Sequence, residues 1–269
     1  MTVGLDVTRT GGVVTVSIDI PPHNIVGADL IIGLFELLPT LESDESAAVV
    51  VFRSADPDFF LMHGDVEALL TMPADDQPVT TPNVAAALFE RITRAPFLTI
   101  GVVDGYARGG GCEFLSALDL RIGTARTVIG QPEVPMGILP GAGGTVRMAR
   151  LLGRAGALEL VLSGRDVHAD EALAIGWLQA IVADDADADR WISRFSALDR
   201  RSVAAVKQVV DVALDDDPGA LTAESAALSA AIAAGSHLGP MRRFLDAGGQ
   251  TRSGEVGPIE PLLLAMRDD

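Results

Sequence analysis

The chain of 269 residues contains one cysteine, one lysine and one tyrosine, and aromatic residues make up only 4% of it. The lone cysteine, Cys112, excludes an internal disulfide and a cysteine-based metal cluster. The histidines are dispersed, and no two have the spacing typical of a metal site; they are His23, His63, His168 and His237. We therefore expect no metal centre.

Positive charge is scarce, with 20 Lys and Arg residues against 37 Asp and Glu and a net charge of −17. Such a surface repels phosphate backbones and anionic lipids, so neither nucleic acid nor a membrane is an expected partner. No apolar run is long enough to span a bilayer, and the first residues do not resemble a signal peptide. These absences predict a soluble cytoplasmic protein.

Hydrophobic residues, by contrast, make up 48% of the chain, which is typical of a globular protein. Period-two patterns predict a β-hairpin over residues 3–20, with its turn at Thr10-Gly11-Gly12. A helical pattern covers 28–41, and a short apolar run over 48–52 predicts a buried parallel strand.

Strand and helix patterns continue to alternate further along the chain. We expect a mobile surface loop over 71–82 and a helix that begins at Thr81-Pro82 and ends near Arg94. The remaining expected elements are strands at 97–103, 120–125, 127–130 and 179–182, helices at 145–152, 154–163 and 169–176, and a wholly helical chain from about 185. This order indicates an α/β fold, with a core domain over 1–190 and a C-terminal helical region over 191–269.

The central feature of the sequence is the glycine turn Gly109-Gly110-Gly111, which follows a β-type run and precedes a helical pattern. Strand, glycine turn and helix can point free backbone N–H groups at an anionic atom. Glu113 follows at once, so donors and a carboxylate stand side by side. A turn that serves only close packing explains the same residues equally well.

Glu133, in the proline-bounded segment Gln131-Pro132-Glu133, is a second candidate carboxylate. A chain that returns to the same end of a sheet would bring it close to Glu113, and paired carboxylates can hold a water and exchange protons with a substrate. Two unrelated surface glutamates would show the same spacing. Gly141-Ala142-Gly143-Gly144 lacks the dinucleotide-binding pattern, and the chain has no nucleophile elbow.

Several motifs in order resemble the enoyl-CoA hydratase/isomerase (crotonase) family. The likeness is strongest over 95–182 and looser over 12–70. It is carried by residues 105–113 (Gly-Tyr-Ala-Arg-Gly-Gly-Gly-Cys-Glu), by Gln131-Pro132-Glu133 and by residues 137–145 (Gly-Ile-Leu-Pro-Gly-Ala-Gly-Gly-Thr).

The resemblance implies an α/β spiral of ββα units with a C-terminal helical region that builds trimers, often paired into hexamers. It implies an acyl-CoA thioester as ligand and no cofactor besides that substrate. The thioester oxygen would lie between the backbone N–H groups of Gly64 and Gly110. Further substrate-binding positions implied by the motifs are His63, Asp65, Gly109 and Gly141.

The two glutamates favour the hydratase branch, in which Glu113 helps to activate water for attack at C3 and Glu133 exchanges the proton at C2. Isomerase-like members usually need one carboxylate, so enoyl-CoA isomerisation remains an alternative, as does a non-catalytic acyl-CoA-binding protein. His63 departs from the family pattern, which has a glycine there, and we interpret it as structural rather than catalytic.

Overall fold

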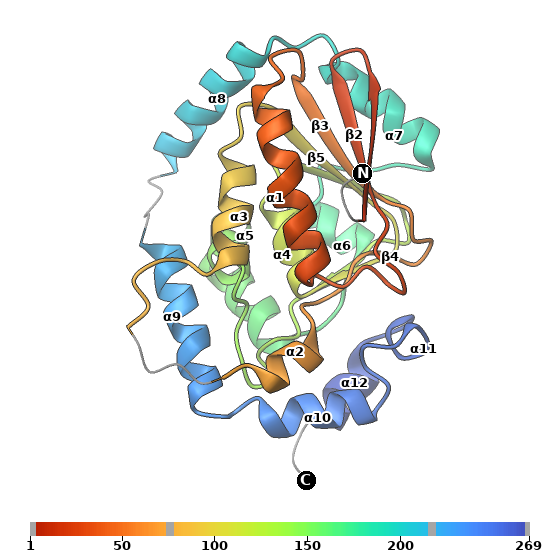
Figure 1. The fold of residues 1–269 in the computed structure, drawn as a ribbon. Coiled ribbons are helices and arrows are strands. Elements are labelled where there is room, and N and C mark those ends of the chain that lie inside the picture. Colours follow the sequence, from red (N-terminus) through yellow and green to blue (C-terminus); the bar gives the residue numbers. More distant parts are fainter. Residues whose placement is uncertain (1–3, 74–77, 215–218, 267–269) are drawn as a thin grey trace.

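The computed structural model describes residues 4–73, 78–214 and 219–266, and Figure 1 shows its fold. The first unit is the expected hairpin, in which β1 pairs antiparallel with β2 in register from Leu5–Ile18 to Thr10–Val13. Gly11 in its turn has φ +59°, a conformation that glycine adopts without strain. The strands are β1 (Leu5–Thr10), β2 (Val13–Ile18), β3 (Val49–Ser54), β4 (Phe59–Leu61), β5 (Leu98–Val103), β6 (Tyr106–Arg108), β7 (Leu120–Gly123), β8 (Val128–Gly130), β9 (Val167–His168) and β10 (Ala180–Ile181).

The strands form two sheets. The larger has the order β1-β2-β3-β5-β7-β10 and the smaller the order β4-β6-β8-β9. In each of the pairs β3/β4, β5/β6 and β7/β8, the first strand lies in the large sheet and the second in the small sheet, and a helical segment then leads to the next strand. This is the expected spiral of ββα units, and the parallel pairing of β3 with β2 and β5 confirms the buried strand predicted at 48–52.

Helices follow the strand pairs and then make up the C-terminal third of the chain. Described helices before residue 180 are α1 (Ala28–Ser43), α2 (Val66–Thr71), α3 (Val84–Thr93), α4 (Gly110–Ser116), α5 (Gly144–Ser163) and α6 (Ala169–Ala174). Those beyond are α7 (Asp185–Ile192), a 3₁₀ turn (Ser193–Phe195), α8 (Arg200–Ala213), α9 (Ala220–Ala233), α10 (Leu238–Asp246), α11 (Arg252–Glu255) and α12 (Glu260–Ala265). The helical C-terminal region is thereby confirmed as secondary structure.

One detail of the expected helices is wrong. Helix α3 does not start at Thr81-Pro82, because the Asn83 side chain accepts a hydrogen bond from the Ala86 N–H and is the true N-cap. The break expected between two helices at residue 153 is confirmed, because Gly153 has non-helical backbone angles (φ +70°, ψ 171°) and divides α5 into two helical segments at a kink. Part of the loop expected over 71–82 lies at 74–77, outside the described residues.

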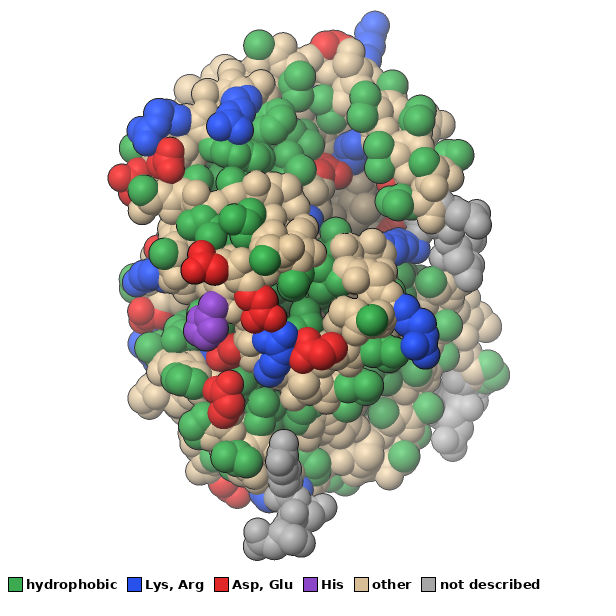
Figure 2. Space-filling view, turned by 180° about the vertical axis from the view of Figure 1, so that it is seen from behind, with side chains coloured by type: hydrophobic (Ala, Val, Ile, Leu, Met, Phe, Trp, Pro, Cys, Tyr) green, Lys and Arg blue, Asp and Glu red, His purple; other side chains and the backbone are tan. Residues whose placement is uncertain are grey.

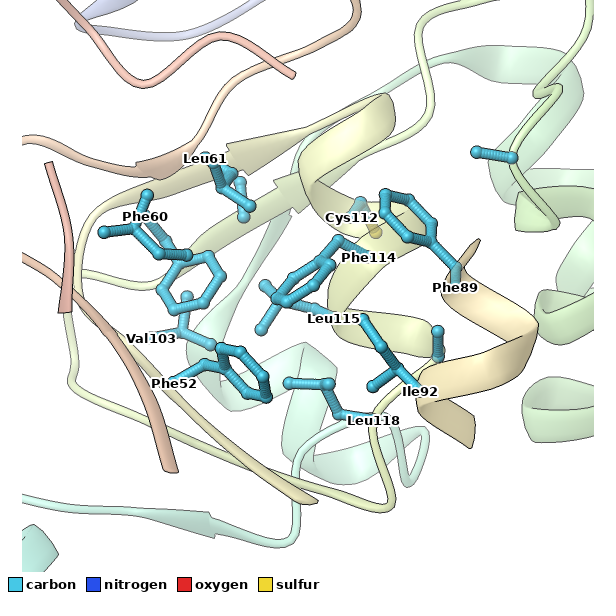
Figure 3. Packing of buried hydrophobic residues seen from close by; sticks show 14 of the residues in the cluster. Phe52, Phe60, Leu61, Phe89, Ile92, Val103, Cys112, Phe114, Leu115 and Leu118 are labelled. Carbon is cyan, nitrogen blue, oxygen red and sulfur yellow. The ribbon is translucent and has the colours of Figure 1, made fainter. Parts of the chain in front are cut away.

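The main hydrophobic core lies between the sheets and helices α1, α3, α4 and α5. Phe114 of α4 is its centre, with ring centroids 5.2 Å from Phe52 and 5.3 Å from Phe89 in edge-to-face arrangements. Such aromatic pairs contribute about 0.5–1.5 kcal/mol each beyond the buried area. Figure 3 shows these rings around the buried Cys112, which fills space as a small apolar side chain.

A second hydrophobic cluster joins the C-terminal helices to the loops beside the glycine turn. It contains Val66, Met136, Ile138, Ile232, Met241, Phe244, Ile259, Leu262, Leu263 and Met266. In Figure 1, α9, α10 and α12 run past α2 along one side and the base of the molecule. The C-terminal helices therefore form one wall of the space next to the glycine turn.

Charged side chains are interspersed with hydrophobic ones on the face seen in Figure 2. Within the described ranges, no helix combines the length and the apolar character that crossing a membrane requires.

Candidate active site

Three parallel strands of the small sheet end at the same edge. β4 pairs with β6 and β6 with β8, so their carboxyl ends are neighbours. Gly64 follows β4, Gly110 follows β6 and Glu133 follows β8, each within three residues of the strand end. Ligands of open α/β sheets commonly bind at such an edge. The topology thus brings together three residues that are far apart in the sequence.

The glycine turn serves both of the purposes that its sequence allows. Gly109 has φ +50°, and a Cβ there would lie 2.7 Å from Glu133 Oε1. A Cβ on Gly111 would lie 2.0 Å from the carbonyl oxygen of Leu61, so only glycine lets α4 approach β4 this closely. Close packing and an open helix N-terminus therefore occur together.

The backbone amides of Gly64 and Gly110 lie beside each other. A Cβ on Gly110 would be 3.2 Å from the Gly64 nitrogen. Gly110 is the first residue of α4, where N–H groups have no partner within the helix. The backbone of the first loop at Gly64 thus lies close to the N-terminus of α4 at Gly110.

Glu113 is fully buried at the start of α4. Its Oε1 accepts hydrogen bonds from the N–H groups of Ala142 (2.7 Å) and Gly144 (2.8 Å), which place it against the second glycine loop. Burial and, to a lesser extent, the nearby charge of Glu224 raise the pKa of Glu113 to about 8, although the two amides lower it.

Glu133 is buried on the opposite loop, and its carboxyl interacts electrostatically with those of Glu113 and Glu224. Burial raises the pKa of its carboxyl well above the ordinary value, and repulsion from Glu113 adds to this. With the Gln131 amide oriented as a donor, its nitrogen lies 2.9 Å from Glu133 Oε2. Both carboxyls therefore disfavour ionisation.

A third buried carboxylate, Glu224 of α9, was not expected from the sequence. It accepts hydrogen bonds from the N–H groups of Gly143 (2.5 Å) and Val146 (3.1 Å) and so caps the start of α5. Arg147 lies in the same group and forms an ion pair with Glu90 at 3.0 Å. Neither residue lies in a recognisable motif, so only the folded chain shows that they surround Glu113.

These groups line a cavity of about 620 Å³. Its polar wall contains Gly64, Gly110, Glu113 and Glu133. Its apolar wall comes mainly from α1, α2, the loop after β8 and α9; the apolar residues include Val26, Ile31, Leu69, Met72, Met136, Ile138, Leu228 and Ile232. The volume and lining suit an organic ligand with an apolar chain and one polar reacting group.

Of the other predicted substrate-binding positions, His63, Asp65 and Gly141 line this cavity, whereas Gly109 precedes Gly110 in the turn and is not part of the lining. Asp65 caps α2 by accepting from the Ala68 N–H, and Gly141 accepts from the Asn83 side chain. His63 lines the cavity but is 95% buried as a side chain and bonds to Glu255. Among the residues that the structure describes, no group of three or more His, Cys, Asp or Glu is arranged to hold a metal ion.

The fold is the crotonase fold, as comparison with solved structures shows. A protein from Streptomyces avermitilis, provisionally named an enoyl-CoA hydratase, is 34% identical with a TM-score of 0.83, and 98% of each chain is covered. DspI from Pseudomonas aeruginosa is 26% identical with a TM-score of 0.71, covering 80% of this chain and 89% of the other. An enoyl-CoA hydratase from Bacillus halodurans (21%, TM-score 0.80, 89% and 99% covered) shares the fold.

The sequence profile of the enoyl-CoA hydratase/isomerase family matches residues 8–237. The chain belongs to the enoyl-CoA hydratase/isomerase family.

The raised pKa of Glu113 predicts how stability depends on pH. Between its ordinary value of 4.5 and about 8, the unfolded chain loses this proton while the folded chain keeps it, so stability falls as pH rises through that window. Glu113→Gln keeps an acceptor for both amides and removes the charge. We expect the variant to have a higher Tm than wild type near pH 9 and nearly the same Tm near pH 4. Each kcal/mol of stability gained should raise Tm by roughly 2–4 °C.

Thermal unfolding at the two pH values measures this effect, and Glu36→Gln on the exposed side of α1 is the matched control. A Tm difference that is the same at both pH values would contradict the assignment of a buried, mostly protonated Glu113.

Proposed function

We propose that the protein catalyses the reversible addition of water to a 2-enoyl-CoA thioester, which gives a 3-hydroxyacyl-CoA. One observation carries the proposal: two buried carboxyls, Glu113 and Glu133, line the same cavity as the adjacent amides of Gly64 and Gly110. Attack on a conjugated thioester places negative charge on the carbonyl oxygen, and two fixed N–H donors stabilise that charge.

The proposed roles follow from the positions of the two carboxyls. Glu113 accepts a proton from the water whose oxygen forms the bond to C3, and Glu133 gives a proton to C2. Oε1 of Glu113 is held by two amides, so its Oε2 is the atom left to contact water. The charge of an ionised Glu113 raises the pKa of Glu133, so Glu133 keeps the proton that it gives to C2 while Glu113 acts as the base.

Double-bond migration in a 3-enoyl-CoA is the second candidate. It needs one group to move a proton between two carbons, and Glu133 is the freer carboxyl because two amides of another loop hold Glu113. Hydration and migration pass through the same stabilised charge, so the amides do not distinguish them. The number of carboxyls in the cavity favours hydration.

Turnover of a short 2-enoyl-CoA against the matching 3-enoyl-CoA tests the proposal. We expect kcat/KM for hydration to exceed that for migration by roughly 10-fold or more. Only hydration uses both carboxyls, and one general acid–base group typically contributes roughly 10²–10⁴-fold to the rate. Loss of the absorbance of the conjugated thioester follows the first reaction, and its appearance follows the second. The variant Glu113→Gln/Glu133→Gln is the blank. Migration without hydration would overturn the assignment, and so would binding without turnover, the outcome expected of a non-catalytic acyl-CoA-binding protein.

A further inference from the structure

His63 is a buried side chain whose two ring nitrogens both face acceptors. Nδ1 lies 2.8 Å from the carbonyl oxygen of Gly64, and Nε2 lies 2.8 Å from Oε1 of Glu255. A carbonyl oxygen has no hydrogen to give. The same Glu255 oxygen also accepts the N–H of Gln250 at 2.9 Å, and Arg108 lies 3.7 Å from the other oxygen, so the surroundings favour an ionised Glu255. With that carboxylate as the acceptor for Nε2 and the Gly64 carbonyl as the acceptor for Nδ1, both ring nitrogens carry hydrogens and the ring is an imidazolium.

The surroundings of the ring form a closed group of charges. Arg108 of β6 makes two hydrogen bonds to Asp166 (2.8 and 2.7 Å) and lies 3.7 Å from Glu255 Oε2. The cations His63 and Arg108 thus balance the anions Asp166 and Glu255. On the cavity side, Gly109 separates His63 from the carboxyl of Glu133, and α10 contributes the uncharged ring of Phe244 at 5.4 Å.

Burial opposes the charge on the ring, but the carboxylate of Glu255 and the carbonyl of Gly64 together more than offset it, so the pKa of His63 is raised. Burial also opposes the charge on Glu255, but His63, the Gln250 N–H and Arg108 together more than offset it, so the pKa of Glu255 is lowered. The directions of the two shifts agree with the charges that the hydrogen bonds require.

His63 holds Gly64 from both sides. Its own carbonyl accepts the N–H of Val26 at 3.1 Å, and because the peptide is planar and trans, this fixes the Gly64 N–H on the opposite side. The ring of His63, through Nδ1, also holds the carbonyl oxygen of Gly64. A glycine with no such contacts would have unusual backbone freedom at this point.

We propose that His63, protonated and held by Glu255, is a positioning residue that aims the Gly64 N–H at the thioester oxygen, an inference that rests on the proposed function. The C-terminal segment thereby controls the first loop of the site. Val66 and Asp65 strengthen the connection, since Gln250 accepts from the Val66 N–H (2.7 Å) and donates to Asp65 (3.1 Å). Loss of the ring proton removes one of its two hydrogen bonds and releases Gly64.

Glu255→Gln removes the charge and keeps an oxygen that faces Nε2. We expect the pH at which His63 titrates to fall by about one unit or more, because the offset to burial is lost. The alkaline limb of the pH profile of kcat/KM should move down by the same amount. ¹⁵N NMR of the ring nitrogens measures the titration without any turnover, and His63→Gln identifies the signals among four histidines.

His63→Gln can make only one of the two hydrogen bonds at a time. We expect kcat/KM to fall by roughly 10- to 100-fold, mostly through kcat. This loss is smaller than the roughly 10²–10³-fold typical of removing an oxyanion-hole donor altogether, because the Gly64 N–H is displaced and not removed. His168→Gln, at an exposed position, is the matched control and should stay near wild type.

A neutral His63 ring at pH 7 overturns the inference, as does an alkaline limb that Glu255→Gln leaves in place. If the ring is doubly protonated but no enoyl-CoA is turned over, the proposed function fails and the positioning role fails with it, while the NMR result separates that case from a wrong charge assignment.

Discussion

Replacement of Glu133 by glutamine is expected to lower kcat for 2-enoyl-CoA hydration by roughly 10²–10⁴-fold, and replacement of Glu113 by a similar factor. Each substitution keeps the size of a fully buried side chain and removes its ability to exchange a proton. Steady-state kinetics measures the loss, and calorimetric titration with a saturated acyl-CoA measures binding. We expect Kd to change much less than kcat.

The double variant sharpens this expectation. Residues that act as one unit show strongly non-additive losses. Glu113→Gln/Glu133→Gln should therefore cost little more than the worse single variant. Glu36→Gln on the exposed side of α1 serves as the control. If both single variants keep near-wild-type turnover, the two-carboxyl mechanism is wrong.

Gly110→Ala is expected to give the second large effect, a fall in kcat/KM that approaches the 10²–10³-fold typical of a lost oxyanion donor. The new Cβ would lie 3.1 Å from the Cβ of Val26 and 3.2 Å from the nitrogen of Gly64. Neither neighbour is the end of a flexible side chain, so one of the two loops must move. The movement separates the two amides that the site needs side by side.

Two other glycine variants, Gly111→Ala and Gly239→Ala, distinguish this loss of activity from unfolding. Gly111→Ala would place a Cβ 2.0 Å from the carbonyl oxygen of Leu61 and should lower Tm strongly. Gly239→Ala in α10 meets only the end of Arg243 and should behave as wild type. Gly110→Ala should resemble Gly239→Ala in Tm and not in kcat/KM. A fully active Gly110→Ala would refute the assignment of Gly110 as a donor.

Local sequence predicted most elements of the core. The hairpin over residues 3–20 and the strand at 48–52 followed from periodicity, because each face of a strand or helix meets one environment. The start of α3 was missed, since Thr81-Pro82 and Asn83 are both good caps and the choice depends on packing against Gly141. The break at Gly153 was predicted correctly, because glycine readily adopts the non-helical angles found there.

The residues of the site likewise divide into those that sequence motifs predicted and those that they did not. Glu113, Glu133 and the glycine turn stood out through their motifs, and the structure places them at one cavity. Glu224 and Glu255 belong to the C-terminal helices, lie in no motif, and were not expected. His63 was noticed only as a departure from the family pattern, and its two hydrogen bonds could not be foreseen without the position of Glu255.

By itself, the sequence determined the α/β class, the glycine turn and the identity of the two carboxyls, because these depend on local pattern and residue chemistry. Tertiary structure alone decided which groups surround them. Burial and the approach of Glu224 raise the pKa of Glu113, and Glu255 holds the charge of His63, from positions 111 and 192 residues away along the chain (224 − 113 and 255 − 63). Electrostatic free energies depend on distance through space and on exclusion of water, and neither quantity is written in the order of the residues.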